Sequence, residues 1–481
     1  MLVAGGFNPR NRKPIEFFVT ERRLKSIYSL GARKVLIPGA RMGLREIVFT
    51  SHWYRATCLE SICICLAMKP SLISVVFFSL ICSSPGGSAA LASFNVRDFG
   101  ALGDGTNKDT VAFQKTLDAC AVAGGGEVLV PAGNYLIGSV QLGNRTVLRL
   151  GKDGVLVGSA DTNDYPMLDV RWEGRWQPGR RALIYAANVD HTGIIGPGRV
   201  EGNPAVAAPQ NPRGAVVLEA ASCRDVRWEN FTVTQGGNWA THPVYCCELL
   251  VKTVTINGRR DGIDVDSCQN VRLEGCDIDT GDDSISLKSG RGLDGARIGR
   301  PTENVLIAGC NLRCSRFACI GIGSETSGGI RNVRIEHCRF KSHSYAIYVK
   351  SRIGRAGVIE NIYGDDLDIL AGGFLHVNLI SVGNRNTYDD PVEGLAGYPQ
   401  GRNFRFSNIR VACTTLADVS QISAEKPLDG LVLINITGTC AKGIFLQNVA
   451  RALLRNLHVT GYQGAFLTLT NVQGRGLAVL K

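Results

Sequence analysis

The sequence predicts an all-β fold, a right-handed single-stranded parallel β-helix with an N-terminal capping helix. Glycine is abundant, at 57 of 481 residues, and aromatic residues make up only 7%, a balance that suits stacked strands and turns better than helical bundles. Short stretches alternate Val, Ile or Leu with polar residues, as strands do. From about residue 215 the chain repeats itself loosely. One such unit cannot bury its apolar side alone, whereas a stack buries a continuous core.

The repeat is clearest in four segments that each combine a strand, a tight turn and another strand. These segments begin at Arg224, Gln269, Glu303 and Arg331. Their valines at positions 226, 271, 305 and 333 are 45, 34 and 28 residues apart, which corresponds to one or two coils each time. Asparagines recur at the turns, and we expect Asn270, Asn304 and Asn332 to form a ladder of stacked side-chain hydrogen bonds.

The strongest helical pattern lies at residues 108–120, near the beginning of the main domain. Asp109 and Thr110 are the candidate N-caps. The predicted apolar face of this helix consists of Val111, Phe113, Leu117 and Cys120. We expect the helix to plug the N-terminal end of the stack and to protect its exposed strand edge.

The positive charge of the chain is concentrated at its beginning. Residues 1–67 hold eleven Lys or Arg and four Asp or Glu, which accounts for +7 of the formal net charge of +11. Lys69 adds one more, so the chain from Ser93 onward carries about +3. This part shows neither a strongly basic surface nor a nucleic-acid motif, and we do not expect it to bind nucleic acid.

Residues 68–92 have the order of a secretory signal peptide. Met68-Lys69 gives a small positive start, an apolar run extends from residue 72 to 82, and Ala90-Leu91-Ala92 offers a cleavage site of small residues. The apolar run is too short for a convincing membrane span. We therefore expect no stable membrane insertion after signal removal, and a secreted or periplasmic location.

The chain thus divides into three parts. Export signals normally begin a chain, so residues 1–67 are interpreted as a spurious upstream extension or an unassigned leader. Residues 68–92 form the signal peptide, and residues 93–481 form the β-helix domain. Twelve of the sixteen cysteines follow the signal, and we interpret them as packing residues with a few disulfides, because their spacing does not match a zinc site.

Two neighbouring segments carry the residues with the clearest chemical meaning. Asp261 opens Asp261-Gly-Ile-Asp-Val-Asp-Ser-Cys268, and Asp282 and Asp283 lie in Gly281-Asp-Asp-Ser-Ile-Ser-Leu-Lys288. Both segments alternate apolar and polar residues, and they lie about one coil apart. Equivalent positions of neighbouring coils stack at roughly 4.8 Å, so we expect Asp261 beside Asp282 and Asp283.

Crowding of three carboxylates has a chemical consequence. They cannot all ionise cheaply, so one of them is expected to hold a proton near neutral pH. A protonated carboxyl group beside ionised ones is what acid–base cleavage of a glycosidic bond requires. The segments therefore predict a polysaccharide hydrolase.

Longer motifs point to one family. The segment Asn238-Trp-Ala-Thr-His-Pro-Val-Tyr-Cys246 contains Trp-x-x-His-Pro, and Gly321-Ile-Gly-Ser-Glu-Thr-Ser-Gly-Gly follows the two aspartate segments. On these motifs and on the two aspartate segments, residues 94 to 460 resemble the polygalacturonases of glycoside hydrolase family 28. The resemblance implies that Asp282 is the general acid and that Asp261 and Asp283 activate water. The family inverts the anomeric centre, which calls for roughly 6.5–9.5 Å between acid and base. It implies no metal and no cofactor.

Three positions depart from the family's pattern. Arg259-Arg260 stands where the family usually has Asn-Thr, and Arg316-Phe317-Ala318 lacks the histidine of the family's Gly-His-Gly segment. Tyr348 and Lys350 lie where the family has an Arg-x-Lys pair that grips the substrate carboxylate, so only the lysine remains. A lost bidentate arginine changes carboxylate recognition, and we expect Arg259 or Arg260 to compensate from the other side.

Three further residues complete the predicted substrate-binding set. Tyr388 matches a substrate-binding tyrosine of the family, Lys288 lies on the same outward parity as Asp282, and His242 belongs to the Trp-x-x-His-Pro segment. His242 also has a structural interpretation, as a satisfied buried histidine. Glu325 is interpreted as a turn-stabilising group.

Together these features predict a secreted glycoside hydrolase that cleaves α-1,4-linked galacturonate chains of pectin by an inverting mechanism. We expect it to act on its polysaccharide as a monomer. One alternative is hydrolysis of a related backbone, such as rhamnogalacturonan or a neutral-sugar linkage, as Phe317 and Tyr348 indicate. The other is a non-catalytic carbohydrate-binding β-helix, against which the three aspartates argue, because a binder has little need for crowded like charges.

Overall fold

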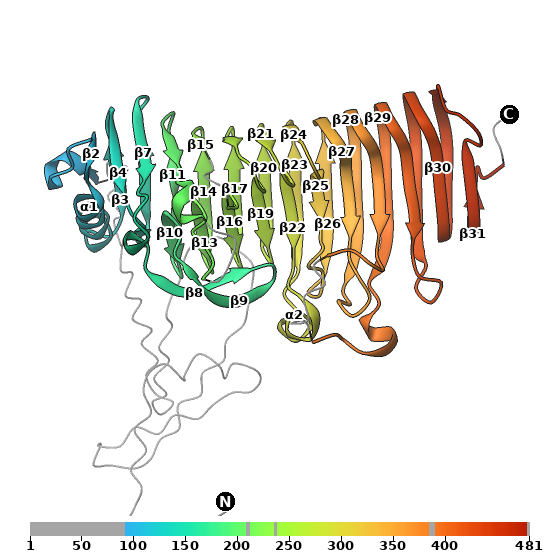
Figure 1. Ribbon diagram of the computed structural model, residues 1–481, viewed down its shortest axis with the longest axis horizontal. Coiled ribbons are helices and arrows are strands. Elements are labelled where there is room, and N and C mark those ends of the chain that lie inside the picture. Colours follow the sequence, from blue (N-terminus) through green and yellow to red (C-terminus); the bar gives the residue numbers. More distant parts are fainter. Residues whose placement is uncertain (1–91, 208–211, 235–237, 384–389, 479–481) are drawn as a thin grey trace, which may run out of the picture. The chain divides into compact units, whose positions relative to one another are not determined.

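The computed structural model describes residues 92–478, apart from 208–211, 235–237 and 384–389. In this part the chain winds into coils whose strands pair in parallel with those of neighbouring coils (Figure 1). The fold is a right-handed single-stranded parallel β-helix, which confirms the prediction. The interpreted extension at 1–67, the predicted signal peptide at 68–92 (Ala92 apart) and Tyr388 lie outside the described residues.

One face of the coils carries the candidate site, and we call it the site face. Its short strands are β5 (Val140–Leu142), β10 (Ile184–Ala187), β13 (Leu218–Ala221), β16 (Thr241–Val244), β19 (Ile263–Asp266), β22 (Ile285–Lys288) and β25 (Ala318–Ile322). Residues 345–350 of β27 (Arg339–Lys350) and residues 373–378 of β28 (Val358–Asn378) continue it.

Two other faces complete each coil. The second face consists of β1 (Ser93–Asn95), β3 (Gly126–Val130), β6 (Thr146–Leu150), β11 (Asp190–Ile195), β14 (Arg224–Glu229), β17 (Cys247–Lys252), β20 (Gln269–Glu274), β23 (Thr302–Ala308) and β26 (Ile330–Glu336). The third face consists of β2 (Asp104–Lys108), β4 (Gly133–Ile137), β7 (Gly154–Gly158), β12 (Arg199–Glu201), β15 (Thr232–Thr234), β18 (Thr255–Asn257), β21 (Asp277–Thr280) and β24 (Asn311–Cys314). Toward the C-terminus the strands lengthen and bend around the corners, as in β29 (Gln400–Gln421), β30 (Leu428–Thr460) and β31 (Leu467–Arg475).

The repeat seen in the sequence is one row of stacked core residues. Its members pair in register in the order Val226, Leu249, Val271, Val305 and Val333. The 45-residue gap between the first two valines therefore spans two coils, because Leu249 of β17 replaces valine in the coil between them. These side chains are almost fully buried. The core is a ladder of like apolar residues, as the repeat predicted.

The predicted asparagine ladder is present at the turn before the second face. Asn304 donates through its amide to the Oδ1 of Asn270 at 3.0 Å, and Asn332 donates to Asn304 at 3.0 Å. The ladder continues through Asn361 and Asn403 at 2.9 and 3.1 Å. Each of the five has a positive φ between 54° and 57°, a conformation that asparagine tolerates better than most residues. The same side chains thus allow the turn and join the coils.

The predicted helix is present as α1 (Thr110–Val122), which packs on β3 and β5 at the first coils. Phe113, Leu117 and Cys120 are buried as expected. Val111 is 65% exposed, so its assignment to the apolar face was wrong. Asp109 occupies the N-cap position, but its carboxylate accepts hydrogen bonds from the backbone N–H groups of residues 102 and 103 instead of capping the helix.

Two insertions between strands of the coils lie beside the site face. The antiparallel hairpin of β8 (Met167–Trp172) and β9 (Arg175–Arg180) is inserted between β7 and β10 and runs along one edge of the coils (Figure 1). The short helix α2 (Gly292–Ile298) follows β22. The 3₁₀ helices are η2 (Val96–Phe99), η3 (Thr162–Asp164), η4 (Pro204–Val206) and η5 (Gly394–Gly397).

The twelve cysteines of the β-helix domain are all free thiols. Ten are buried, several of them stacked in the core, and Cys247 and Cys413 are half-buried. The packing interpretation is therefore confirmed, whereas the expectation of a few disulfides was wrong, because none of these twelve cysteines is paired. Among the described helices, none is long and apolar enough to cross a membrane.

Candidate active site

The three predicted aspartates lie together at the turns that enter two neighbouring strands of the site face. Asp261 precedes β19, and Asp282 and Asp283 precede β22. One carboxylate oxygen from each of them lies within 4.8 Å of one from each of the others. The two turns are joined by the backbone N–H of Gly262, which donates to the carbonyl oxygen of Asp283 at 3.0 Å. The structure thus brings together the residues that the spacing of the two segments predicted.

The separation of these carboxylates differs from the expectation. An inverting pair calls for roughly 6.5–9.5 Å between acid and base, whereas the oxygens of this cluster lie within 4.8 Å. The reason is that the two turns belong to adjacent coils, whose backbone hydrogen bonds hold them at strand spacing.

Asp283 is the most firmly held of the three. Its Oδ2 accepts hydrogen bonds from the Lys350 ammonium at 2.5 Å and from the Ser286 hydroxyl at 2.9 Å, and its Oδ1 accepts one from the backbone N–H of Ala318 at 3.1 Å. A side chain at Gly321 would collide with this carboxylate, so a glycine is needed there. Three donors hold Asp283 in one orientation with its charge compensated.

Burial and like charges favour the protonated forms of the other two. Burial, with the Asp282 and Asp283 charges, raises the pKa of Asp261 to about 7, although the Lys288 ammonium opposes this shift. Burial and the Asp283 charge also raise the pKa of Asp282. Asp282 accepts a hydrogen bond from the backbone N–H of Asp283 at 3.0 Å. The cluster therefore retains a proton near neutral pH, as acid–base chemistry needs.

Lys288 lies beneath the aspartates and is only 5% exposed. Its Nζ is 3.2 Å from Asp264, 3.5 Å from Glu325 and 3.9 Å from Asp261. Burial lowers the pKa of Lys288. The nearby carboxyl groups of Glu325, Asp264 and Asp261 have the larger effect, and they raise this pKa well above its ordinary value. This lysine is enclosed by protein carboxyl groups, so it compensates their charge from below.

The other two carboxyl groups around Lys288 differ in the form that their surroundings favour, which is protonated for Asp264 and ionised for Glu325. Burial, and then the nearby Asp261, raises the pKa of Asp264 well above its ordinary value. Burial also disfavours ionisation of Glu325, but Lys288 and two arginines hold the pKa of Glu325 at about 2. Glu325 was interpreted as a turn residue, yet it is 4% exposed and faces the site network.

His242 lies in a second buried group, on the N-terminal side of the aspartates. It is 1% exposed, its Nε2 is 3.9 Å from Asp266, and its ring meets that of Trp239 edge-on at 5.0 Å. Burial lowers the pKa of His242 to about 3. The structure therefore places this residue as a neutral, enclosed histidine.

The β8–β9 hairpin encloses His242. Arg171 of β8 forms an ion pair with Asp266 at 2.7 Å, with both side chains 1% exposed. The neighbouring Trp172 stacks on Trp239, with ring centroids 3.6 Å apart. On the site face the outward-pointing Glu219 and His242, in β13 and β16, are 4% and 1% exposed. The N-terminal side of the site face is therefore covered.

Arg259 and Arg260 line a hollow of about 600 Å³ beside the aspartates, together with Arg316. The hollow lies at the turns between the third face and the site face, with Asp279 on its rim. Arg316 donates to the carbonyl oxygens of residues 281 and 259 at 2.9 and 3.0 Å, so it holds the two turns together. The charge of Arg260 also lowers the pKa of Asp282, in opposition to burial. The three guanidinium groups make this hollow basic.

On the C-terminal side the site face carries aromatic residues. Tyr348 is half-buried in the coil after Gly321, and Lys350 lies with its Nζ 5.5 Å from the Tyr348 ring centroid and 5.9 Å from that of Phe317. Phe317 is 47% exposed. Lys350 and Tyr348 thus lie next to the carboxylates, at the positions where the resemblance implied a substrate-binding pair.

Several residues of the site escaped the sequence interpretation. Asp264 lies within the aspartate segment, between the apolar Ile263 and Val265. This alternation places Asp264 on the outward side of the strand and could have identified it as a site residue. Arg171 is 95 residues from its partner Asp266, so no local pattern connects the two.

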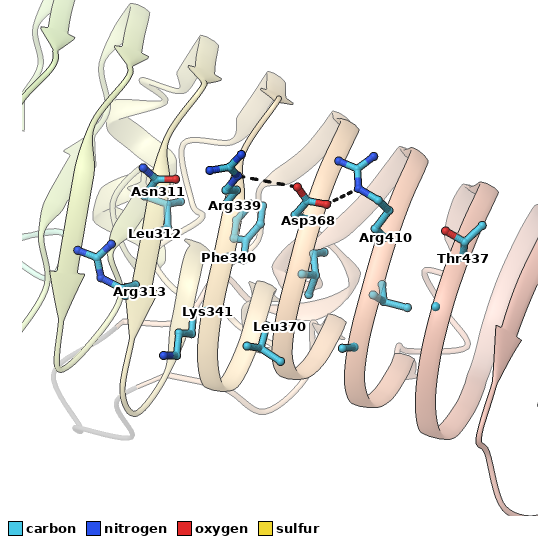
Figure 2. A pocket seen from close by; sticks show the side chains of 14 residues that line it. Asn311, Leu312, Arg313, Arg339, Phe340, Lys341, Asp368, Leu370, Arg410 and Thr437 are labelled. Carbon is cyan, nitrogen blue, oxygen red and sulfur yellow. Dashed lines mark hydrogen bonds and ion pairs between the residues drawn. The ribbon is translucent and has the colours of Figure 1, made fainter.

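A second hollow of about 600 Å³ lies on the third face, away from the aspartates (Figure 2). Its floor is apolar, and Leu370 at its edge is 55% exposed. Asp368 lies between Arg339 and Arg410 and pairs with both. Asp368 is the one carboxyl group among the residues that line this hollow, so the lining holds no acid–base pair.

The chain is similar to known proteins over most of its described length. A model of glycosyl hydrolases family 28 matches residues 120–369. A probable polygalacturonase of Vitis vinifera is 30% identical over 384 residues, which cover 75% of this chain and 75% of that protein. Polygalacturonase-2 of Solanum lycopersicum is 24% identical over 76% of this chain and 78% of its own length.

Solved structures show the same fold at lower identity. A family 28 exopolygalacturonase of Yersinia enterocolitica aligns with a TM-score of 0.68 and 19% identity, covering 82% of this chain and 80% of its own. An exopolygalacturonase of Thermotoga maritima aligns with a TM-score of 0.60 and 23% identity, covering 80% of this chain and 92% of its own.

Proposed function

This chain belongs to family 28 of the glycosyl hydrolases and is a glycoside hydrolase, and we propose that it cleaves α-1,4-linked galacturonate chains of pectin. The observation that carries the proposal is the cluster of Asp261, Asp282 and Asp283, with one oxygen of each within 4.8 Å of the others. Basic groups flank this cluster, as a polyuronate substrate requires. The names of the similar proteins, which are polygalacturonases, support the same substrate.

The roles follow from the surroundings of each carboxyl group. Asp282 holds its proton because it is buried beside the Asp283 charge, so it donates that proton to the glycosidic oxygen. Asp283 is fixed by three donors, one of them the Lys350 ammonium, so it orients the attacking water together with Asp261. Once Asp261 is ionised, above its pKa of about 7, the water gives its proton to this carboxylate, and the water oxygen forms the new bond to the anomeric carbon as the old bond breaks.

The substrate's carboxylates meet cations on the basic side of the cluster. Arg259 and Arg260 line the hollow beside the aspartates, where a guanidinium can bind a carboxylate through two hydrogen bonds. Lys350 contributes a further charge, part of which Asp283 already compensates. His242 and Lys288 are enclosed by protein groups, so they support the site without contacting the sugar. This differs from the substrate contact that the sequence predicted for them.

The decisive experiment is release of reducing ends from polygalacturonate by the full chain and by Asp282→Asn. We expect release by the wild type and its loss in the variant. Arg260→Ala is expected to raise KM for polygalacturonate more than it lowers kcat. Unchanged kinetics in Arg260→Ala would contradict its role in binding, and equal release by Asp282→Asn would contradict the acid assignment.

Inversion is the second element of the proposal. It rests on family membership, because the short separation of the carboxylates would by itself fit a retaining pair. Proton NMR of the first products distinguishes the two outcomes, since inversion at an α-linkage yields the β-anomer. An initial α-anomer would show retention and would assign a nucleophile among the three aspartates.

Export is the third element. Residues 68–92 have the order of a signal peptide, with a cleavage site at Ala90-Leu91-Ala92. We expect mature protein that begins at Ser93 outside the cytoplasm. N-terminal sequencing of the protein recovered from the medium or periplasm tests this, and a start within residues 1–67 would contradict it.

A related backbone remains the second candidate substrate. The observation that favours it is the aromatic surface beside Lys350, where Tyr348 takes the place of a second cation.

A further inference from the structure

Asp264 is a completely buried carboxyl group of β19, on the outward side of the strand that follows Asp261. Among the described residues, neither of its two oxygens has a hydrogen-bond partner. Its register neighbour in the next coil, Ser286, donates its hydroxyl group to Asp283 at 2.9 Å instead. An ionised carboxylate that is buried without a donor loses its hydration uncompensated, so the charged neighbours of Asp264 decide its form.

The Lys288 ammonium is shared by Asp264 and two other carboxyl groups. Its Nζ lies 3.2 Å from Oδ1 of Asp264, 3.9 Å from Oδ2 of Asp261 and 3.5 Å from Oε2 of Glu325. All three carboxyl groups are buried. Lys288 and two arginines hold Glu325 in its ionised form. If Asp264 and Asp261 were both ionised as well, they would share a single ammonium that Glu325 also uses, and such an uncompensated buried charge is costly.

A proton between Asp264 and Asp261 removes this imbalance, and Asp264 is the group that holds it. Burial, then the charge of Asp261, and also a hydrogen bond with Asp261 raise the pKa of Asp264 well above its ordinary value. The pKa of Asp261 reaches about 7, because Lys288 opposes the effect of burial. An ionised carboxylate accepts hydrogen bonds but donates none, so the bond between these two side chains needs the proton of one of them. Asp264, the more deeply buried, is the donor.

The other charged groups around Asp264 do not replace this proton. On β16, which pairs with β19, His242 is neutral because burial lowers its pKa to about 3. Asp266 of the same strand is already paired with Arg171 at 2.7 Å. The charge of Arg213 attracts the ionised form of Asp264, yet neither oxygen of Asp264 accepts a hydrogen bond from this guanidinium.

We propose that Asp264 is a positioning residue of the hydrolytic site, whose carboxyl group keeps its proton and donates it in a hydrogen bond to the Asp261 carboxylate. This bond stabilises the ionised form of Asp261 and fixes the direction of its other oxygen toward the attacking water. Asp264 acts only through Asp261, because it is enclosed by protein groups. The inference rests on the proposed hydrolysis and adds the group that prepares its base.

The first experiment measures how kcat/KM of the full chain on polygalacturonate depends on pH. The acidic limb of this profile follows ionisation of the base. Asp264→Ala loses the donor, so the ionised form of Asp261 becomes less stable and the limb is expected to move up by about one pH unit. Asp264→Asn keeps a donor, the side-chain amide, in nearly the same shape. In this variant the limb is expected to stay close to its wild-type position.

An ionised Asp264 would give a different result. Both variants would then remove a negative charge beside Asp261, and the limb would move to lower pH in each. That outcome overturns the proposal, as do equal shifts in the two variants or no shift in either. The matched control is Glu325→Gln, which removes an ionised carboxylate from the same ammonium and is expected to move the limb to lower pH. A folding defect lowers kcat but does not move the limb.

Infrared spectroscopy separates this proposal from the proposed function, because it needs no substrate. At neutral pH the difference spectrum between the wild type and Asp264→Asn is expected to contain the C=O band of a protonated carboxyl group. The band is expected to shift in Asp261→Ala, which removes the acceptor. If the wild type does not cleave polygalacturonate, the proposed function fails, and a band that shifts in this way still supports the hydrogen bond. A carboxylate band in its place, or a band indifferent to Asp261→Ala, overturns the inference whatever the activity.

Discussion

Lys350 reaches back across the glycine of the intervening coil and places its ammonium nitrogen 2.5 Å from Oδ2 of Asp283. The side chains of the pair are 13% and 2% exposed. In a site this enclosed, the orientation of the Asp283 carboxylate depends on a residue 67 positions away in the sequence. The pair links the acid–base cluster to the aromatic side of the site face.

Removal of Lys350 is therefore expected to affect both folding and activity. Lys350→Met leaves the Asp283 carboxylate buried without its counter-ion, which costs about 3–5 kcal/mol of unfolding free energy. We also expect a large fall in kcat on polygalacturonate. Urea unfolding and initial rates measure the two effects. Lys341→Met, an exposed lysine of the same strand, is the control and is expected to change neither. Similar stability of the two variants would contradict the importance of the ion pair.

The raised pKa of Asp261 predicts how stability varies with pH. Its pKa is about 7 in the folded protein and 3.8 as the ordinary value, so the folded state binds this proton more tightly. The stability that Asp261 contributes is then complete below about pH 4 and is lost as pH rises toward 7. We expect Asp261→Asn to gain stability relative to the wild type between these pH values. Chemical unfolding at pH 4 and pH 7.5 measures the difference, and a constant difference would contradict the raised pKa.

Lys288 and Glu325 are expected to shift the pH dependence of activity in opposite directions. Lys288→Met removes the ammonium that opposes protonation of Asp261, so the acidic limb of the kcat/KM profile is expected to move to higher pH. Glu325→Gln frees Lys288 from one carboxylate, so the limb is expected to move to lower pH. Lys288→Arg is the charge-preserving control. Equal shifts of the acidic limb in Lys288→Met and Glu325→Gln would show that the charges of these two residues do not set the pKa of Asp261.

The covered N-terminal side of the site face predicts cleavage near chain ends. Glu219 and His242 are enclosed, whereas Tyr348 on the other side is half-exposed and the side chain of Asp418 is 34% exposed. A polymer lying along the site face can therefore extend from the aspartates toward the C-terminal coils only. We expect short products from the start of digestion, with a slow fall in polymer length. Chromatographic sizing of early products tests this, and early mid-chain fragments would contradict it.

The Arg171–Asp266 pair is expected to anchor the hairpin that covers this side. Both side chains are 1% exposed, so Arg171→Met is expected to cost about 3–5 kcal/mol of unfolding free energy. The matched control is the exposed Arg224–Glu248 pair, whose side chains are 60% and 46% exposed. Arg224→Met is expected to cost less than about 1 kcal/mol. Thermal or urea unfolding of both variants compares them, and equal costs would contradict the anchoring role.

The sequence predicted the coils well because their determinants are local. The valine row and the asparagine turns recur in the chain, and one coil is enough to place Asp261 beside Asp282 and Asp283. It could not predict the residues that enclose the site, because these come from insertions between coils. Arg171 reaches Asp266 from a hairpin, and no periodic pattern connects the two. For the same reason His242 and Lys288 were assigned to substrate, although neighbouring elements bury them.

The asparagine ladder shows that the pitch of the β-helix does not depend on the number of residues in each coil. Its successive members are 34, 28, 29 and 42 residues apart in the chain, yet their hydrogen bonds stay between 2.9 and 3.1 Å. The extra residues of the longer coils leave the stack after the site face, as α2 and the segment after β28 do. These insertions lie directly before Asn304 and Asn403, so the ladder keeps the pitch of the helix at the same turn where the loops vary in length. Longer insertions at this turn can therefore change which polysaccharides fit the site face without moving the catalytic aspartates.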